Sequence, residues 1–175
     1  MTEALAPPPS AVAPRVVYRQ ALARDGADQA EVFYHAVMQG AANHYTLDER
    51  RAWANVLPRE ACAWTARHPL YTTLVATCDG RCVGFLELDV SNGRVETLYV
   101  WPSLNGRGIG TTLLIHAERW LLEAGRSTIE IEASRVLYER LERRGWQNLG
   151  ERWVERGGAP LQRYHLRKPL LAVET

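Results

Sequence analysis

One run of fifteen residues constrains the fold of this chain more than any other segment. It reads VWPSLNGRGIGTTLL from Val100 to Leu114 and follows the apolar segment 95–100. Its three glycines predict a tight turn, because glycine adopts left-handed backbone conformations without steric cost. The residues after the turn have the apolar spacing of a long amphipathic helix. The run therefore predicts a buried strand, a glycine-rich turn and a helix in succession.

The turn and the start of this helix predict an anion-binding site. The first N–H groups of a helix have no intrahelical partner, and the helix dipole places about half a positive charge at that end. Both effects favour a phosphate or a pyrophosphate. Arg107 adds a guanidinium that can bind two phosphate oxygens. We expect the bound anion to be part of a cofactor.

The glycine spacing excludes two nucleotide-binding motifs. A dinucleotide fingerprint requires G-x-G-x-x-G, whereas this run has G-x-G-x-G. A phosphate-cradling P-loop requires a lysine directly after its last glycine, and the only lysine of the chain is Lys168. The cofactor is therefore of another kind.

The rest of the chain alternates between strand and helix patterns. Thr46 and Glu49 have the spacing of a capping box, which predicts the start of a helix. Asp79-Gly80 between two apolar segments is typical of a hairpin turn. We expect strands over 16–22, 72–77, 81–90, 93–100, 128–133, 148–155 and 161–166, and helices over 28–42, 46–56, 108–124 and 134–144, with a short helical stretch over 59–67.

This order of elements, together with the glycine run, resembles the GCN5-related N-acetyltransferase (GNAT) family. The acetyl-CoA signature of that family is [Gln/Arg]-x-x-Gly-x-[Gly/Ala] after a strand that ends V-x-P. Gly108 and Gly110 match it, and Asn105 stands close to where the family usually has Gln or Arg. The resemblance covers about residues 15–170, and segments 44–53 and 152–170 look like a branch of small bacterial members with unsettled substrates. It implies an α/β (α+β) fold with a mixed central sheet of six to seven strands, a splayed pair of strands and about four flanking helices.

The resemblance also implies an activity, a cofactor and its binding residues. The expected enzyme moves an acetyl group from acetyl-CoA to a primary amine by direct attack in a ternary complex, and needs no metal. In this family the strand before the signature splays from the next strand, so its N–H groups are free to bind the cofactor. The implied cofactor-binding residues are Leu98, Tyr99, Val100, Asn105, Gly106, Arg107, Gly108, Ile109, Gly110 and Thr111.

Deprotonating the acceptor amine is a demanding step. At pH 7 it costs about 4.6 kcal/mol for a lysine-like amine and about 1 kcal/mol for an α-amine. Glu130 is the first choice for the base, because the ribosomal-protein alanine acetyltransferases of this family carry theirs on the splayed strand. Glu96, on the facing strand, is the second choice and Glu132 is a reserve. A non-catalytic role, as a solvated or ion-paired glutamate, is an equally good interpretation of Glu130 and of Glu96.

A general acid for the departing thiolate is the weakest match to the family pattern. The family has a tyrosine four positions before the glycine of F-Y-x-x-x-G-F, and here that position, counted from Gly145, is Leu141. Tyr138 lies one helical turn earlier and is the candidate acid, with packing beside the pantetheine arm as the alternative. An acid is also dispensable, because a thiol pKa near 8.5 means that protonation supplies only about 2 kcal/mol at pH 7.

Acceptor binding in the family comes from the region between the first two helices and from the closing hairpin. Here these are His44, Tyr45 and Trp53, with Tyr164 as a weaker candidate. Packing at a helix end is the alternative for His44 and Tyr45. The sequence leaves a protein N-terminus, a lysine, a polyamine, an aminoglycoside and a small amine all open as acceptors.

Composition limits the partners and the location. The 175 residues, 46% hydrophobic, suit one domain with a full core, and we expect that domain over 15–175 after a flexible leader, 1–14. A net charge of +1 argues against nucleic acid or an anionic membrane as the main partner, and no apolar run is long enough for a membrane span. Three cysteines without a zinc-like pair favour the reducing cytoplasm. The sequence leaves open whether the chain forms a homodimer.

Two other functions also stay open from the sequence. One is a module that senses acyl-CoA without transferring the acyl group. Glutamates on both splayed strands argue weakly against it. The other is a transferase for a different acyl group, such as propionyl or succinyl.

Overall fold

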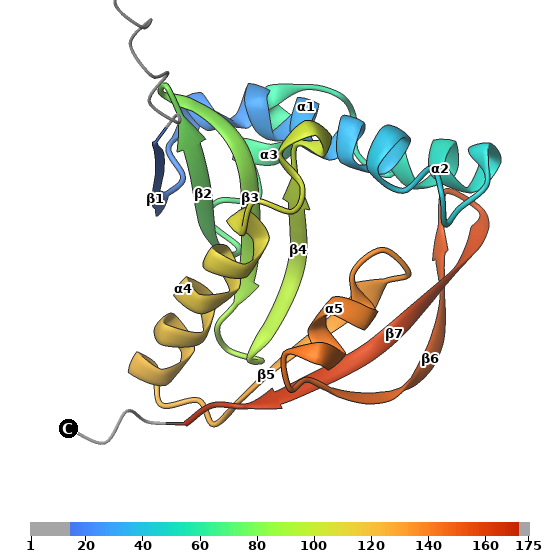
Figure 1. Cartoon of the computed structure of the whole chain (residues 1–175). Coiled ribbons are helices and arrows are strands. Elements are labelled where there is room, and N and C mark those ends of the chain that lie inside the picture. Colours follow the sequence, from blue (N-terminus) through green and yellow to red (C-terminus); the bar gives the residue numbers. More distant parts are fainter. Residues whose placement is uncertain (1–14, 172–175) are drawn as a thin grey trace, which may run out of the picture.

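The computed structural model describes residues 15–171, so the expected leader lies outside the described residues. Its centre is one mixed sheet with the strand order β1-β2-β3-β4-β5-β7-β6 (Figure 1). All neighbouring strands are antiparallel except β4 and β5, which are parallel. The strands are β1 (Val16–Gln20), β2 (Thr72–Cys78), β3 (Arg81–Asp89), β4 (Arg94–Val100), β5 (Thr128–Ser134), β6 (Gln147–Arg156) and β7 (Ala159–Pro169).

Helices cover both faces of this sheet and divide the apolar interior into two cores. One core contains α4 and α5, which lie together on the near face in Figure 1, and the other contains α1, α2 and α3. No helix in the described part of the chain is long and apolar enough to cross a membrane. The helices are α1 (Gly26–His35), α2 (Leu47–Ala54), α3 (Ala61–Thr65), α4 (Ile109–Glu123) and α5 (Tyr138–Arg143), with short 3₁₀ turns over Ala23–Asp25 and Pro102–Leu104 and a π turn over Ala36–Gly40.

The sequence predicted the type and order of these elements, and the mixed sheet with a splayed pair is confirmed. The capping box is also confirmed, since Thr46 Oγ1 accepts from the Glu49 N–H and the Glu49 carboxylate accepts from the Thr46 N–H. The helix predicted over 134–144 starts too early. Ser134 still pairs with Arg163 of β7, which keeps it in β5, and α5 begins only at Tyr138.

A β-bulge in β4 bends this strand away from β5. On β3, Glu87 faces Thr97 and Leu88 faces Val95, so Glu96 is an extra residue without a partner. Bulges of this kind sharpen the local twist and redirect side chains. Directly before the bulge, β4 and β5 pair only at Arg94–Glu130 and Val95–Ile131. Beyond that point the two strands diverge.

A buried ion pair stabilises β4 beside the bulge. The Glu87 side chain has no exposed surface, and its carboxylate accepts from Arg67 at 2.7 and 2.9 Å and from Thr97 Oγ1 at 3.0 Å. A buried carboxylate needs such partners, because losing one leaves an uncompensated charge. The contact therefore holds the first residue after the bulge against β3.

The far end of the β6–β7 hairpin packs closely against α2. A Cβ on Gly157, whose φ is +56°, would lie only 2.5 Å from the Ala52 carbonyl oxygen. A residue with a side chain would therefore push α2 away from the hairpin. This contact sets α2, and with it Trp53, over the outer strands of the sheet.

Candidate functional site

A cavity of about 630 Å³ lies where β4 and β5 diverge. One wall is β4 over 97–100 and the opposite wall is β5 over 131–134. Backbone N–H groups on diverging strands have no partner across the gap, so they can bind a ligand. Residues of both apolar cores line the cavity, so it extends from one face of the sheet to the other.

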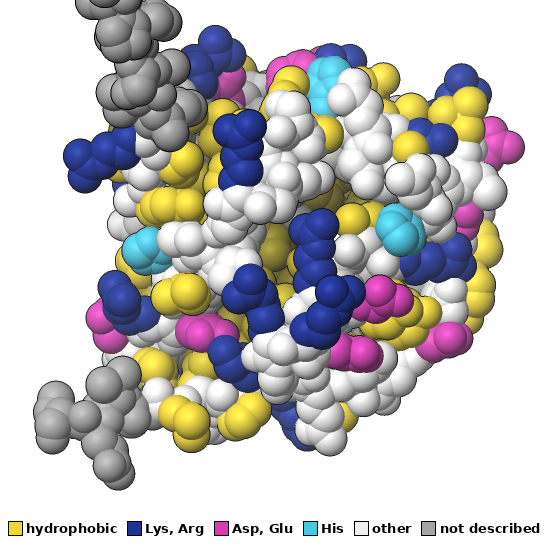
Figure 2. Space-filling model, viewed as in Figure 1, with side chains coloured by type: hydrophobic (Ala, Val, Ile, Leu, Met, Phe, Trp, Pro, Cys, Tyr) yellow, Lys and Arg dark blue, Asp and Glu magenta, His cyan; other side chains and the backbone are white. Residues whose placement is uncertain are grey.

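The first opening, here called the glycine-loop mouth, lies between α4 and α5. Gly108 is the N-cap of α4 with a left-handed backbone (φ +80°), and it turns the chain so that the first N–H groups of α4 face the cavity. Figure 2 shows this mouth as a hollow with a hydrophobic floor, flanked by Lys and Arg side chains. These features suit a ligand with an apolar arm and anionic groups.

The structure brings together nearly all of the predicted cofactor-binding residues at this cavity. Only Arg107 is absent from its lining, and its side chain is exposed. The predicted residues that do line the cavity are Leu98, Tyr99, Val100, Asn105, Gly106, Gly108, Ile109, Gly110 and Thr111.

Three arginines at the glycine-loop mouth were missed by the sequence reading. Arg140, Arg143 and Arg144 line the cavity from α5 and from the residue after it. Their spacing of three and four places them on one side of a helix. This spacing could have identified the three arginines from the sequence, because residues 134–144 were predicted to form a helix next to the glycine loop.

The end of the cavity on the opposite face of the sheet is here called the Trp53 mouth. Trp53 is 5% exposed, and its indole N–H donates to the Tyr99 hydroxyl at 3.2 Å. The Arg163 guanidinium lies over the Trp53 ring, 4.6 Å from its centroid. All three residues line the cavity. Arg163 was not singled out in the sequence, because its position in the middle of β7 gave no local sign of a ligand.

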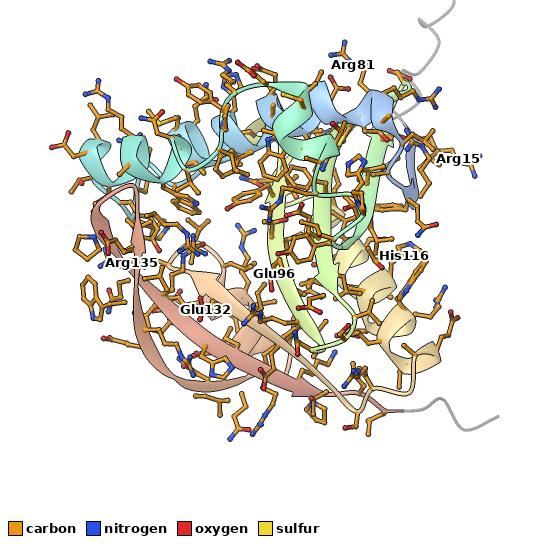
Figure 3. All side chains as sticks on the ribbon, turned by 180° about the vertical axis from the view of Figure 1, so that it is seen from behind. Arg15, Arg81, Glu96, His116, Glu132 and Arg135 are labelled. Atoms are coloured by element: carbon orange, nitrogen blue, oxygen red, sulfur yellow. The ribbon has the colours of Figure 1, made fainter. Side chains whose placement is uncertain are left out.

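Two carboxylates also line the cavity, one from each diverging strand. Glu96 is the extra residue of the β4 bulge, and Glu132 projects from β5 (Figure 3). Arg94 donates to Glu96 Oε1 at 2.6 and 2.8 Å, which raises the pKa of Arg94. The nearest basic group to the Glu132 carboxylate is Arg152, at 3.9 Å. Glu132 is therefore the less tightly held of the two.

Glu130, the first choice for the base, lies outside this group. It sits at the level where β4 and β5 still pair, and it is absent from the cavity lining. Its carboxylate lies 3.4 Å from His165 and 3.8 Å from Arg167, both on β7. The bulge moves the point of divergence past Glu130, so the geometry favours Glu96 and Glu132.

Tyr138, the candidate acid, is also absent from the cavity lining. Its ring stacks on Tyr164 at 3.9 Å, and its hydroxyl donates to the Glu139 carboxylate at 3.1 Å. The hydrogen bond to Glu139 raises the pKa of Tyr138 to about 12. The neighbouring Leu137 and Leu141 line the cavity instead.

Of the predicted acceptor-binding residues, only Trp53 lines the cavity. Tyr45 is buried, and its hydroxyl donates to the Gln162 carbonyl at 2.7 Å and accepts from the Arg135 N–H at 3.0 Å. Burial raises the pKa of Tyr45. His44 is exposed, and its carbonyl accepts from the Arg135 side chain. These contacts give Tyr45 a structural role, joining α2 to β7 and to the turn after β5.

Family models and curated proteins both match this chain. A family model described as an acetyltransferase (GNAT) domain matches residues 41–168. An uncharacterized N-acetyltransferase of Archaeoglobus fulgidus is 32% identical over 95 residues. This match covers 49% of the chain and 63% of the archaeal protein, which is less than two thirds of that relative's length.

Solved structures match over nearly the full chain. A GCN5-related N-acetyltransferase from Rhodopseudomonas palustris has a TM-score of 0.82 at 29% identity, over 91% of this chain and 97% of that one. The PaiA N-acetyltransferase from Thermoplasma acidophilum, solved with coenzyme A, has a TM-score of 0.66 at 18% identity, over 89% and 99% of the two chains. The second likeness concerns the fold alone.

Proposed function

The chain belongs to the GNAT acetyltransferase family, and we propose that it moves an acetyl group from acetyl-CoA to a primary amine by direct attack in a ternary complex. The observation that carries this proposal is one cavity that extends between the two faces of the sheet. One mouth suits an anionic cofactor, and the other presents two carboxylates to an incoming amine. In this proposal the two reactants approach from opposite faces of the sheet and meet between β4 and β5.

Acetyl-CoA, which supplies an activated acetyl thioester, enters at the glycine-loop mouth in this proposal. The N–H groups at the start of α4 hold the pyrophosphate, and Arg107 and the three arginines near α5 balance its charge. Trp101 donates its N–H to Val83 of β3, so the alternation along β4 leaves the N–H groups of Leu98 and Val100 free to bind the pantetheine amides and the thioester oxygen. One such donor contributes about 3 kcal/mol to lowering the barrier when charge develops on that oxygen. The coenzyme A in the PaiA structure supports a site for this cofactor on the fold.

Glu96 and Glu132 take the proton of the acceptor amine, directly or through water. Both carboxylates line the cavity, while Glu130 does not. Glu132 accepts no hydrogen bond on its side chain within the described residues, and one oxygen of Glu96 is free of Arg94. General-base assistance of this kind contributes about a hundredfold to ten-thousandfold in rate.

No residue is required as a dedicated acid in this proposal. The thiolate is a tolerable leaving group, and water can protonate it at a modest loss of driving force. Tyr138, with its hydroxyl bonded to Glu139, is then a packing residue beside Tyr164.

A panel of amines with acetyl-CoA, with thiol release as the readout, tests the proposal. The panel contains free amino acids, their amides, simple amines, polyamines, an aminoglycoside and a peptide with a free N-terminus. Turnover with at least one of them supports the transferase. Tight binding of coenzyme A without turnover on any of them would indicate an acyl-CoA sensor instead. Faster turnover with propionyl-CoA or succinyl-CoA would indicate a different acyl donor.

A further inference from the structure

Arg163 is a buried cation whose charge the protein leaves unbalanced. Its side chain is 9% exposed and lines the cavity. No ion pair among the described residues includes it, and its buried Nε has no hydrogen-bond partner. Its one side-chain hydrogen bond within residues 15–171 runs from Nη1 to the main-chain oxygen of Glu132, at 3.3 Å. Burying a charge without a partner is costly, which indicates that a ligand supplies the missing anion.

Other arginines of this protein show how a buried or half-buried guanidinium is normally satisfied. Arg67 forms two bonds to the carboxylate of Glu87, at 2.7 and 2.9 Å. Arg135 donates to the Gln162 side chain and to the His44 carbonyl. Among the buried side-chain atoms left without a partner in the described residues, only the Nε of Arg163 belongs to a residue of this cavity.

The guanidinium is held in one place by its surroundings. Its strand, β7, lies between β5 and β6, with Arg163 paired to Ser134 on one side and to Arg152 on the other. The Trp53 ring lies against it, and the Trp53 indole is itself bonded to Tyr99. A planar guanidinium fixed in this way is prepared for two parallel bonds to a carboxylate.

We infer that the acceptor is an amino acid or a close analogue, whose carboxylate binds Arg163 at the Trp53 mouth. This inference rests on the proposed function and narrows its substrate class. The Arg163 guanidinium is bonded to the main chain of Glu132, whose carboxylate lines the same cavity. An amine one carbon from a carboxylate can therefore face Glu132 and Glu96 while its carboxylate faces Arg163. Polyamines and aminoglycosides bring only positive charge to this buried arginine and are disfavoured.

A matched pair of acceptors tests the inference. Each standard L-amino acid is compared with its own α-carboxamide, which keeps the amine and the side chain and removes the negative charge. We expect kcat/KM for the best amino acid to exceed that of its amide by about a hundredfold, as for a buried charge pair that loses one partner. Simple amines without a carboxylate should resemble the amide.

Arg163 variants connect that preference to this residue. Arg163→Met should bring the acid and the amide to within about threefold by lowering the acid alone, and Arg163→Lys should keep part of the preference, because it retains the charge without the planar fork. Arg167→Met is the matched control. Arg167 is four residues along the same strand, is 44% exposed, and does not line the cavity. Its variant should keep the wild-type preference.

Three results would overturn the inference. The first is a wild-type enzyme that uses amides or simple amines as efficiently as amino acids. Alternatively, Arg163→Met would lower acid and amide equally, which would indicate a role at the thioester. If Arg163→Met does not fold, an Arg163→Lys variant that keeps the full wild-type preference would have the same meaning.

Failure of the proposed function would look different. In that case no acceptor in the amine panel would release thiol, although coenzyme A binds. Amino-acid binding would then be measured from the rise in melting temperature with saturating coenzyme A. A rise with an amino acid but not with its amide, abolished by Arg163→Met, would still support the carboxylate site, and no rise would refute it.

Discussion

The two mouths of the cavity are built in different ways. The glycine-loop mouth comes mostly from one continuous stretch, 98–111, with three arginines added from α5 and the residue after it. The Trp53 mouth comes from four separate elements, which contribute Trp53, Glu96, Glu132 and Arg163. The first mouth is therefore set by local backbone geometry, and the second depends on how distant parts of the chain pack. Substitutions should affect the two mouths differently.

The largest effect is expected at the Trp53 mouth. Changing both Glu96 and Glu132 to Gln should lower kcat by about a hundredfold or more, because it removes both carboxylates that we propose accept the amine proton. The loss should be greatest below about pH 8 and shrink above it, as free amine accumulates. A pH–rate profile with saturating acetyl-CoA measures this effect.

Glu130→Gln is the matched control for that experiment. It is the same change on the same strand as Glu132, at a residue outside the cavity lining. We expect a loss of less than about threefold. If Glu130→Gln lowered kcat more than the double variant does, and in a pH-dependent way, Glu130 would be the base instead.

At the glycine-loop mouth, Gly108→Val should lower the affinity for coenzyme A by about a hundredfold. The backbone of Gly108 is left-handed, which a β-branched residue adopts only with strain, so the first turn of α4 should shift. A Cβ at Gly108 would meet no protein atom within 4 Å, so the fold itself has room for it. Gly108→Asn should bind better than Gly108→Val, since Asn tolerates this conformation. Unchanged affinity by calorimetry in a folded Gly108→Val variant would contradict the proposed cofactor site.

Tyr45→Phe tests whether the Trp53 mouth depends on distant packing. The change removes the hydroxyl that pairs with the half-buried carbonyl of Gln162 and with the main-chain N–H of Arg135. We expect the free energy of unfolding to fall by about 1–3 kcal/mol, measured by urea denaturation, with the affinity for coenzyme A unchanged. Tyr18→Phe removes a hydroxyl that makes no hydrogen bond within the described residues, and it should have little effect. Equal stability of the two variants would refute the structural role of Tyr45.

The arginines near α5 should contribute modestly and in a salt-dependent way. Changing Arg140 and Arg144 to Ala should weaken coenzyme A binding by about tenfold at low salt, because exposed charges are largely screened. Both side chains are exposed. The difference should shrink at high salt, whereas the effect of Gly108→Val should persist. A salt-independent loss would indicate a direct, desolvated phosphate contact instead.

The smallest effect is expected for Tyr138→Phe, which removes only a hydroxyl. That hydroxyl is bonded to Glu139, and the residue does not line the cavity. Turnover should change by less than about threefold. A loss beyond about a hundredfold, with acetyl-CoA affinity intact, would instead make Tyr138 the general acid.

The sequence by itself determined the order of strands and helices, the capping box at Thr46 and the glycine turn before α4. These features depend on residues close together in the chain, through periodicity, capping and turn conformation. The residues of the proposed cofactor site could be predicted to lie together for the same reason, because most of them belong to one continuous run.

The tertiary structure alone decided which carboxylates and which buried cation line the cavity. The bulge at Glu96 sets where β4 leaves β5, and that point falls beyond Glu130. Arg163 faces the cavity because β7 lies beside β5 and α2 brings Trp53 over it. A bulge and a long-range strand pairing arise from contacts between residues far apart in the chain. Local sequence patterns do not predict those contacts.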